Sequence, residues 1–300
     1  MRARAVALVV ALASARAARA QQLTPGAYLP APTGVNVAGA SNALTSGDVS
    51  FDPSLPIDEA SATIDTIAFT YTRTFGLAGR FANAVVAVPV VAGHLRGRYL
   101  GEFQQIERYG IGDVPVRLGV NLYGAPALSL KDFAKRPRGA ILGASLTAVV
   151  PVGQYDSSKL INIGNHRWAF KPELGFAKVV GRWLFETYGG VWLFTDNDDF
   201  HNGGVREQRP LYSAQFHVHY AFRPGMWVAF NSNFYEGGQT SVNHHLNLDF
   251  QKNSRLGATF ALPAGRSQQV RFSISQGVYT TIGGDFLSVG ASYQYAWGGR

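Results

Sequence analysis

The sequence alternates between apolar and polar residues with a period of two over long stretches. From Tyr212 to Phe222 the even positions are all apolar or aromatic, while Ser213, Gln215, His217 and His219 lie between them. Successive side chains of a β-strand point to opposite faces, whereas an α-helix repeats every ~3.6 residues and would mix the two sets. The segment therefore predicts a β-strand with one apolar and one polar face.

Similar segments recur along the chain, and we expect an all-β fold: a single antiparallel transmembrane β-barrel of about 12 strands. Most segments are as long as the ~9–11 residues that a tilted strand needs to cross a membrane, whereas strands of soluble proteins average about five or six. The expected strands are 34–44, 62–74, 81–95, 111–123, 139–152, 168–179, 183–195, 212–222, 226–235, 246–262, 269–279 and 286–297.

The connections between these strands alternate in length. Segments 45–61, 96–110, 153–167, 196–211 and 236–245 are long, and the connections between them are mostly short. In membrane barrels, short turns face the periplasm and long loops face the outside. Two connections break the rule: 124–138 is long where a turn is expected, and 280–284 is short where a loop is expected.

The first residues read as a targeting segment. Basic Arg2 and Arg4 precede a short apolar run, and Ala18-Arg19-Ala20 fits a small-x-small cleavage pattern. We expect a signal peptide at 1–20, a short Pro-rich periplasmic lead-in at 21–33 rather than a folded plug, and the barrel at 34–300. Four of the 27 Lys and Arg lie in this leader, which leaves 23 against 19 acidic residues. That balance does not suggest a nucleic-acid partner.

Alternation alone does not say which face is wet, because a soluble β-sandwich also alternates with its apolar side chains inward. Aromatic residues such as Trp168, Phe222 and Trp297 stand near strand ends, as the interfacial belts of membrane barrels require. The export signal also places the chain beyond the inner membrane. We therefore expect the apolar face to meet lipid and the polar face to meet the interior, with a soluble secreted β-protein as the alternative.

On this interpretation the polar positions are candidate lumen-lining residues. Mixed charged and amide groups can line a water-filled path, or can pair with one another and fill the interior. These candidates are Arg117, Asn121, Lys171, Glu173, Glu186, Gln215, His217, His219, Asn231, Asn233, Arg255 and Arg271.

The sequence gives no catalytic, cofactor or metal site that we would assign. No G-x-S-x-G nucleophile motif or phosphate-binding loop is present. The pair His217 and His219 could ligate a metal, and the acidic loop at 196–201 could bind a divalent cation. Polar lining and a solvated loop are the simpler interpretations, and we expect no cofactor.

Several short motifs resemble one family. Gly110-Ile-Gly-Asp-Val-Pro-Val116, Pro151-Val-Gly-Gln-Tyr-Asp156, Asn162-Ile-Gly-Asn165 and Trp168-Ala-Phe-Lys-Pro-Glu173 are similar to outer-membrane proteins of the MetA-pathway of phenol degradation. The resemblance covers roughly 30–297. It implies a single barrel linked to uptake of aromatic or other hydrophobic compounds. The C-terminus departs from the usual barrel ending, because Gly298, Gly299 and Arg300 follow Trp297.

We therefore expect a passive channel or transporter in a Gram-negative outer membrane, and no enzyme. Its expected partners are outer-membrane lipid, the barrel-assembly machinery and small hydrophobic or aromatic solutes. A closed structural or surface-binding barrel without transport is the alternative, followed by a barrel lipid hydrolase.

Overall fold

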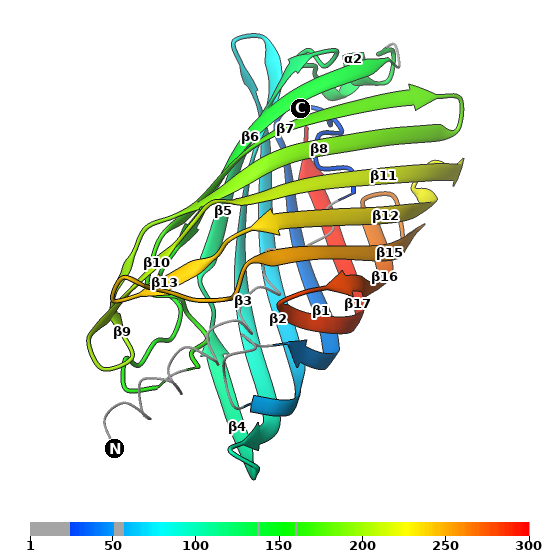
Figure 1. The fold of residues 1–300 in the computed structure, drawn as a ribbon. Coiled ribbons are helices and arrows are strands. Elements are labelled where there is room, and N and C mark those ends of the chain that lie inside the picture. The colour runs from blue at the N-terminus through cyan, green and yellow to red at the C-terminus, as the bar shows by residue number, and fades with distance from the viewer. Residues whose placement is uncertain (1–24, 51–56, 137–138, 160, 300) are drawn as a thin grey trace.

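Twelve antiparallel strands form one closed barrel in the computed structural model (Figure 1), which confirms the predicted fold class. The structure describes residues 25–50, 57–136, 139–159 and 161–299, so the expected signal peptide lies outside the described residues. Pairing of β1 with β17 and of β2 with β3 closes the ring. In ring order the strands are β1 (Val35–Ser50), β2 (Ile57–Leu77), β3 (Arg80–Tyr99), β5 (Val114–Tyr123), β6 (Ala140–Val150), β7 (Ala169–Val180), β8 (Trp183–Phe194), β11 (Leu211–Arg223), β12 (Met226–Gly237), β15 (Gln251–Pro263), β16 (Gln268–Thr280) and β17 (Gly283–Gly298).

The two faces of the wall are arranged inside out relative to a soluble protein. On β11, Gln215 is 2% exposed and His217 is 1% exposed, while the neighbouring Phe216 is 48% exposed. Apolar side chains stand outward on the other strands as well, among them Phe272 and Leu174. A closed sheet of this kind pairs its backbone N–H and C=O groups without an edge, as a wall in hydrocarbon must.

Some segments that we expected to be loops contain strands, and those expectations are wrong. Within 96–110, β4 (Glu102–Ile111) forms a hairpin with the end of β3. The loops 196–211 and 236–245 contribute a separate small sheet of β9 (Asn197–Phe200), β10 (Gly204–Gln208), β13 (Thr240–Val242) and β14 (His245–Leu246). These strands are too short to show a period. The segment 124–138, which is long where a short turn was expected, contains a helical turn, α2 (Leu130–Phe133), capped by Ser129.

Pro89 marks a break in the wall. β3 pairs with β5 up to Val86 and with β4 from Val90 onward, so β4 and β5 act as one strand interrupted at Gly112 and Asp113. The carbonyl of Pro89 accepts from the N–H of Gly112. In an antiparallel pair the N–H and C=O of a residue point to the same side, so the donor that proline lacks falls at the break, where the ladder is already interrupted.

The barrel has two unlike ends. The turns after β2, β5, β7, β11 and β15 lie at the end that holds α2 and the C-terminus (Figure 1), and the small sheet and β4 lie at the other end. Among the described residues, no helix is long and apolar enough to span a membrane.

Candidate functional site: the barrel interior

The inward face of the wall carries every candidate lumen residue. Arg117 and Arg271 are partly exposed, and the other ten candidates are buried. Their alternation with exposed apolar neighbours places them on the inner surface. Whether they line a conducting path stays a prediction.

The segment before β1 packs against this inner surface, which the sequence did not lead us to expect of a lead-in at 21–33. In the described part, 25–33, Tyr28 is only 1% exposed. Its ring lies against Gly143 and Gly175, which are paired across β6 and β7, and a Cβ at either glycine would enter the ring. The guanidinium of Arg117 lies 4.8 Å from the ring centroid.

Polar groups of four strands hold this N-terminal segment in place. The Tyr28 hydroxyl is 2.9 Å from Ser145 Oγ on β6 and donates to Glu173 Oε1 on β7 at 3.1 Å. Asn121 Nδ2 on β5 donates to the Tyr28 carbonyl at 2.9 Å. Glu186 Oε2 on β8 accepts from the Gly26 N–H at 2.9 Å. The segment therefore rests on one side of the barrel, from β5 to β8.

Glu186 is the centre of a buried cluster behind the segment. Its carboxylate accepts from the Tyr188 hydroxyl at 2.6 Å and lies 2.6 Å from His219 Nε2. Lys171 pairs with Glu173 nearby. A buried charge is tolerated where a partner and hydrogen bonds replace its water. Glu186 with His219, and Glu173 with Lys171, therefore face the interior as buried pairs.

The remaining candidates form smaller groups with separate partners. His217 Nδ1 lies 2.8 Å from Asn231 Oδ1, and Asn231 donates to Thr259 Oγ1 at 3.1 Å. Arg255 donates to Ser275 Oγ at 2.8 Å and to Ser288 Oγ at 3.1 Å. Asn233 Nδ2 donates to the Tyr235 hydroxyl, Arg117 donates to Asn83 Oδ1 at 3.3 Å, and Arg271 contacts Gln269 and the Trp227 ring. Gln215 is buried and also has an interaction partner. In the described part of the chain, no three His, Cys, Asp or Glu side chains are placed to hold a metal ion.

The opposite side of the interior carries small hydroxyl residues that the sequence analysis did not single out. Inward positions of β16, β17, β1 and β2 keep part of their exposure to solvent, unlike the buried inward positions of β7, β8 and β11. Short side chains leave more room along this wall than the large ones opposite. These small residues are Ser41, Ala43, Thr45, Thr66, Ala68, Thr70, Thr72, Ser273, Ser275, Ser288, Gly290 and Ser292. On β2, β16 and β17 their alternation with large apolar residues was the available signal, whereas the outward face of β1 is itself made of small and polar residues around Leu44.

The wall beside β4 is closed by a loop rather than by a strand. β6 ends at Val150, level with Val114 of β5, so β4 pairs only with β3 among the described strands. The described parts of the loop, 151–159 and 161–168, lie on the other side, where the backbone N–H of Gln154 donates to the Ile111 carbonyl at 2.8 Å and Arg108 Nε donates to the Ile161 carbonyl at 2.8 Å.

Buried Asp113 ties this loop to the break in the wall. Its carboxylate accepts from the Gly153 N–H at 3.0 Å and from both the N–H and the Nδ2 of Asn165 at 2.8 Å. Further along the loop, the pKa of Asp156 is lowered to about 2. The largest cause is a hydrogen bond from the Ser158 side chain, and the second is a hydrogen bond from Lys159. That carboxylate therefore keeps its charge, and its hold on the turn, at any ordinary pH.

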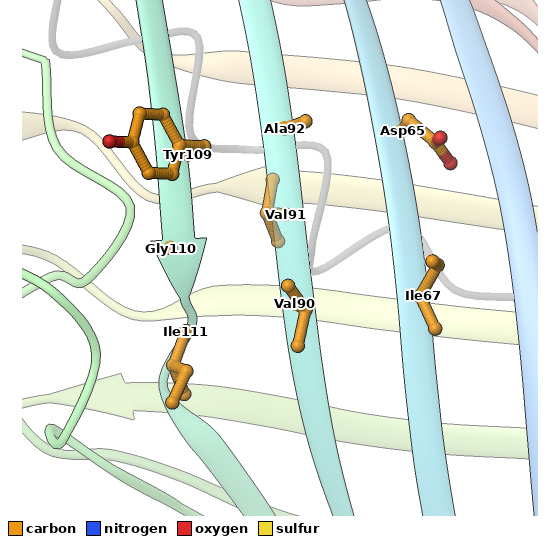
Figure 2. A pocket seen from close by; sticks show the side chains of 8 residues that line it. All are labelled: Asp65, Ile67, Val90, Val91, Ala92, Tyr109, Gly110 and Ile111. Carbon is orange, nitrogen blue, oxygen red and sulfur yellow. The ribbon is translucent and has the colours of Figure 1, made fainter.

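An apolar groove lies on the outer face at the same place. Figure 2 shows its lining on β2, β3 and β4, with the carboxylate of Asp65 at one side. The groove has a volume of about 190 Å³, and Ile67, Val90 and Ile111 are among its apolar residues. The groove extends to the edge of β4, where the loop 151–168 and not another strand lies next to the sheet.

The closed barrel with an apolar exterior and a polar interior defines the class: a β-barrel built for a membrane. The family model described as "Putative MetA-pathway of phenol degradation" matches residues 46–295. The chain belongs to this family, which confirms the resemblance seen in its glycine-rich motifs.

Solved structures show the same fold. An outer membrane channel from Pseudomonas putida F1 matches with a TM-score of 0.76 and 18% identity, over 92% of this chain and 100% of that chain. The transport unit of the autotransporter AIDA-I from Escherichia coli matches with a TM-score of 0.53 and 8% identity, over 98% of this chain and 97% of that chain. No curated protein matches the sequence. The fold is therefore that of outer-membrane barrels.

Proposed function

We propose that the chain is a passive channel of a Gram-negative outer membrane that admits small molecules, aromatic and hydrophobic ones included. The observation that carries this is the hydroxyl-rich side of the interior, which stays accessible to solvent beside the N-terminal segment. A barrel with only a structural role would have no need to line the inner face of these four neighbouring strands with Ser, Thr, Gly and Ala.

Passage would be diffusion between two unlike walls. On one side lie the N-terminal segment and the charged cluster around Glu186, and on the other lie small hydroxyls that offer donors and acceptors without a fixed charge. Arg271, partly exposed and beside the Trp227 ring, is a cation that faces this path from the hydroxyl side. The mechanism requires neither a cofactor nor an enzymatic step.

A second route suits solutes too apolar for a wet path. The loop 151–168 closes the wall beside β4 through side chains and a few backbone bonds, and an apolar groove lies outside it. A loop held in this way opens at a lower cost than a paired strand, whose ladder must break. Hydrophobic molecules would leave sideways here, between the loop and β4, into the lipid.

This proposal also fixes the expected partners and location. The leader at 1–20 directs export, the barrel-assembly machinery inserts the chain, and outer-membrane lipid covers the apolar face. A lipid hydrolase is disfavoured because the interior holds no serine within hydrogen-bond distance of a histidine in any contact of the described chain.

Single-channel conductance of the purified protein in planar bilayers tests the proposal. Ser292 on β17 stands on the hydroxyl side between Ser41 and Arg271. A Ser292→Phe variant should lower the conductance by about half or more, because the ring occupies space beside a path only a few side chains wide. The matched control is Ala291→Phe, which adds the same ring on the lipid side.

Liposome swelling with small neutral solutes gives an independent reading. The wild type should admit them faster than protein-free liposomes, and Ser292→Phe should slow their entry. A verified folded barrel that neither conducts nor admits solutes would favour the closed structural alternative. Equal effects of the two phenylalanine variants would contradict the placement of the path.

A further inference from the structure

Exposed cations gather at one end of the barrel. Each of the five connections at the end with α2 and the C-terminus (Figure 1) contains or adjoins at least one of them. We call the following six the cationic rim: Arg80 after β2, Lys135 after β5, Lys178 and Arg182 around the β7–β8 turn, Arg223 before the β11–β12 turn and Arg266 after β15. The rim therefore runs around the whole mouth rather than along one side.

The rim has almost no compensating negative charge. Within the described connections at this end the acidic residue is Asp132, whose carboxylate already accepts from Ser129 Oγ at 2.7 Å. In the described part of the chain no rim residue forms an ion pair with a carboxylate. The opposite end carries Asp196, Asp198 and Asp199 in one loop. The molecule is thus electrically polarised along the barrel axis.

The rim lies at the depth where lipid headgroups meet the barrel. Lys178 shares the outward face of β7 with Leu174 and Phe176, and its register partner on β8 is the exposed Phe185. Exposed Trp183 begins β8 one residue after Arg182. On the other side of the barrel Tyr71 and Trp297 lie 6.4 Å apart at the same end. Aromatic side chains of this kind mark the membrane interface, and long cationic chains beside them reach the headgroups.

We propose that the cationic rim binds anionic phospholipid headgroups of the inner leaflet. Short turns and both chain ends of outer-membrane barrels face the periplasm, which puts the rim at that leaflet. A soluble acidic partner would need a compact patch, whereas charges spaced around the full circumference match a lipid annulus. The inference rests on the membrane placement in the proposed function and not on transport.

Tryptophan quenching by brominated lipids measures this directly. The purified full chain, with the exposed Trp168 of the other end replaced by Phe, is reconstituted in bilayers that contain dibrominated phosphatidylglycerol or dibrominated phosphatidylcholine. Exposed Trp183 and Trp297 then report contact with the brominated chains. We expect the anionic lipid to bind at least about threefold more strongly at low salt. The preference should fall towards one at high salt, because exposed charges are screened.

A triple variant assigns the preference to the rim. Replacement of Lys178, Arg182 and Arg223 by Gln should reduce the lipid preference to about one. Replacement of Arg96, Arg209 and Lys252 by Gln removes the same number of charges from the other end and should leave the preference unchanged. Equal quenching by both lipids in the wild type, or an equal loss in both triple variants, overturns the proposal. Conductance is recorded on the same samples, so failure of the channel hypothesis is scored separately.

Discussion

Gly143 and Gly175 allow the N-terminal segment to rest against the wall. They face each other across β6 and β7, and the ring of Tyr28 occupies the space that two Cβ atoms would fill. The sequence shows these glycines as ordinary strand residues. Their role depends on a side chain more than a hundred positions away, and no local pattern encodes that contact.

A Gly143→Ala variant should displace the segment. The added methyl group would enter the Tyr28 ring and approach Asn121 Oδ1, and such overpacking costs about 1–3 kcal/mol. The segment can escape this cost by leaving the wall, so we expect higher single-channel conductance and faster proteolysis of residues 25–33.

Gly189→Ala on β8 is the control, because its Cβ would meet nothing within 4 Å. If the two alanine variants have the same conductance and the same protease sensitivity, the position of Tyr28 does not depend on the space left by Gly143 and Gly175. A gain in conductance confined to Gly143→Ala would identify the segment as an obstacle in the path.

At the scale of elements, the twelve wall strands were predictable and the elements between them were not. Lipid on one side and polar groups on the other impose a period of two on each wall strand, and most observed bounds lie within a few residues of the expected ones. β4 and the small sheet lie beyond this constraint. β4 forms a hairpin with β3 beyond the closed wall, and the small sheet joins strands from distant loops, as when Arg206 on β10 pairs in register with Val242 on β13.

The loop beside β4 should depend on Asp113. Its carboxylate accepts from three N–H donors of the loop, which are partly buried, and the loss of an acceptor costs up to about 1–3 kcal/mol for each donor that water does not reach. We expect Asp113→Ala to release the loop, seen as faster limited proteolysis within 153–165 and faster entry of a hydrophobic dye into liposomes.

Asp198→Ala is the matched control, since it removes an exposed carboxylate from β9 of the small sheet at the same end. Proteolysis that increases equally in both variants would mean that Asp113 does not hold the loop. Increased proteolysis in Asp113→Ala without faster dye entry would mean that Asp113 holds the loop but that hydrophobic molecules do not leave the barrel beside it.

At the scale of the whole molecule, the barrel is defined by which face meets lipid. The alternation of the sequence predicted only part of this arrangement. It identified which side chains face the interior, but not which of them contact one another. Pairs such as His217 with Asn231 join neighbouring strands in register, whereas Gly26 with Glu186 joins segments far apart in the chain. The parity was available from the sequence, and the closure that brings the distant groups together required the structure.

Neighbouring residues of β16 provide the sharpest test of this facing. Phe272 is 49% exposed on the outer face, while Ser273 lies on the solvent-accessible hydroxyl side of the interior. Arginine on the lipid face of a barrel costs about 2–4 kcal/mol near the bilayer midplane, whereas arginine in a wet interior keeps its water. Phe272→Arg should therefore lose most of its folded, heat-modifiable form on gels and unfold at lower urea concentration in bilayers. Ser273→Arg should assemble like the wild type and shift ion selectivity towards anions, because its charge stands in the path. Equal loss of folded barrel in both variants would contradict the assignment of the two faces, and the hydroxyl-lined path would then have no inner surface on which to lie.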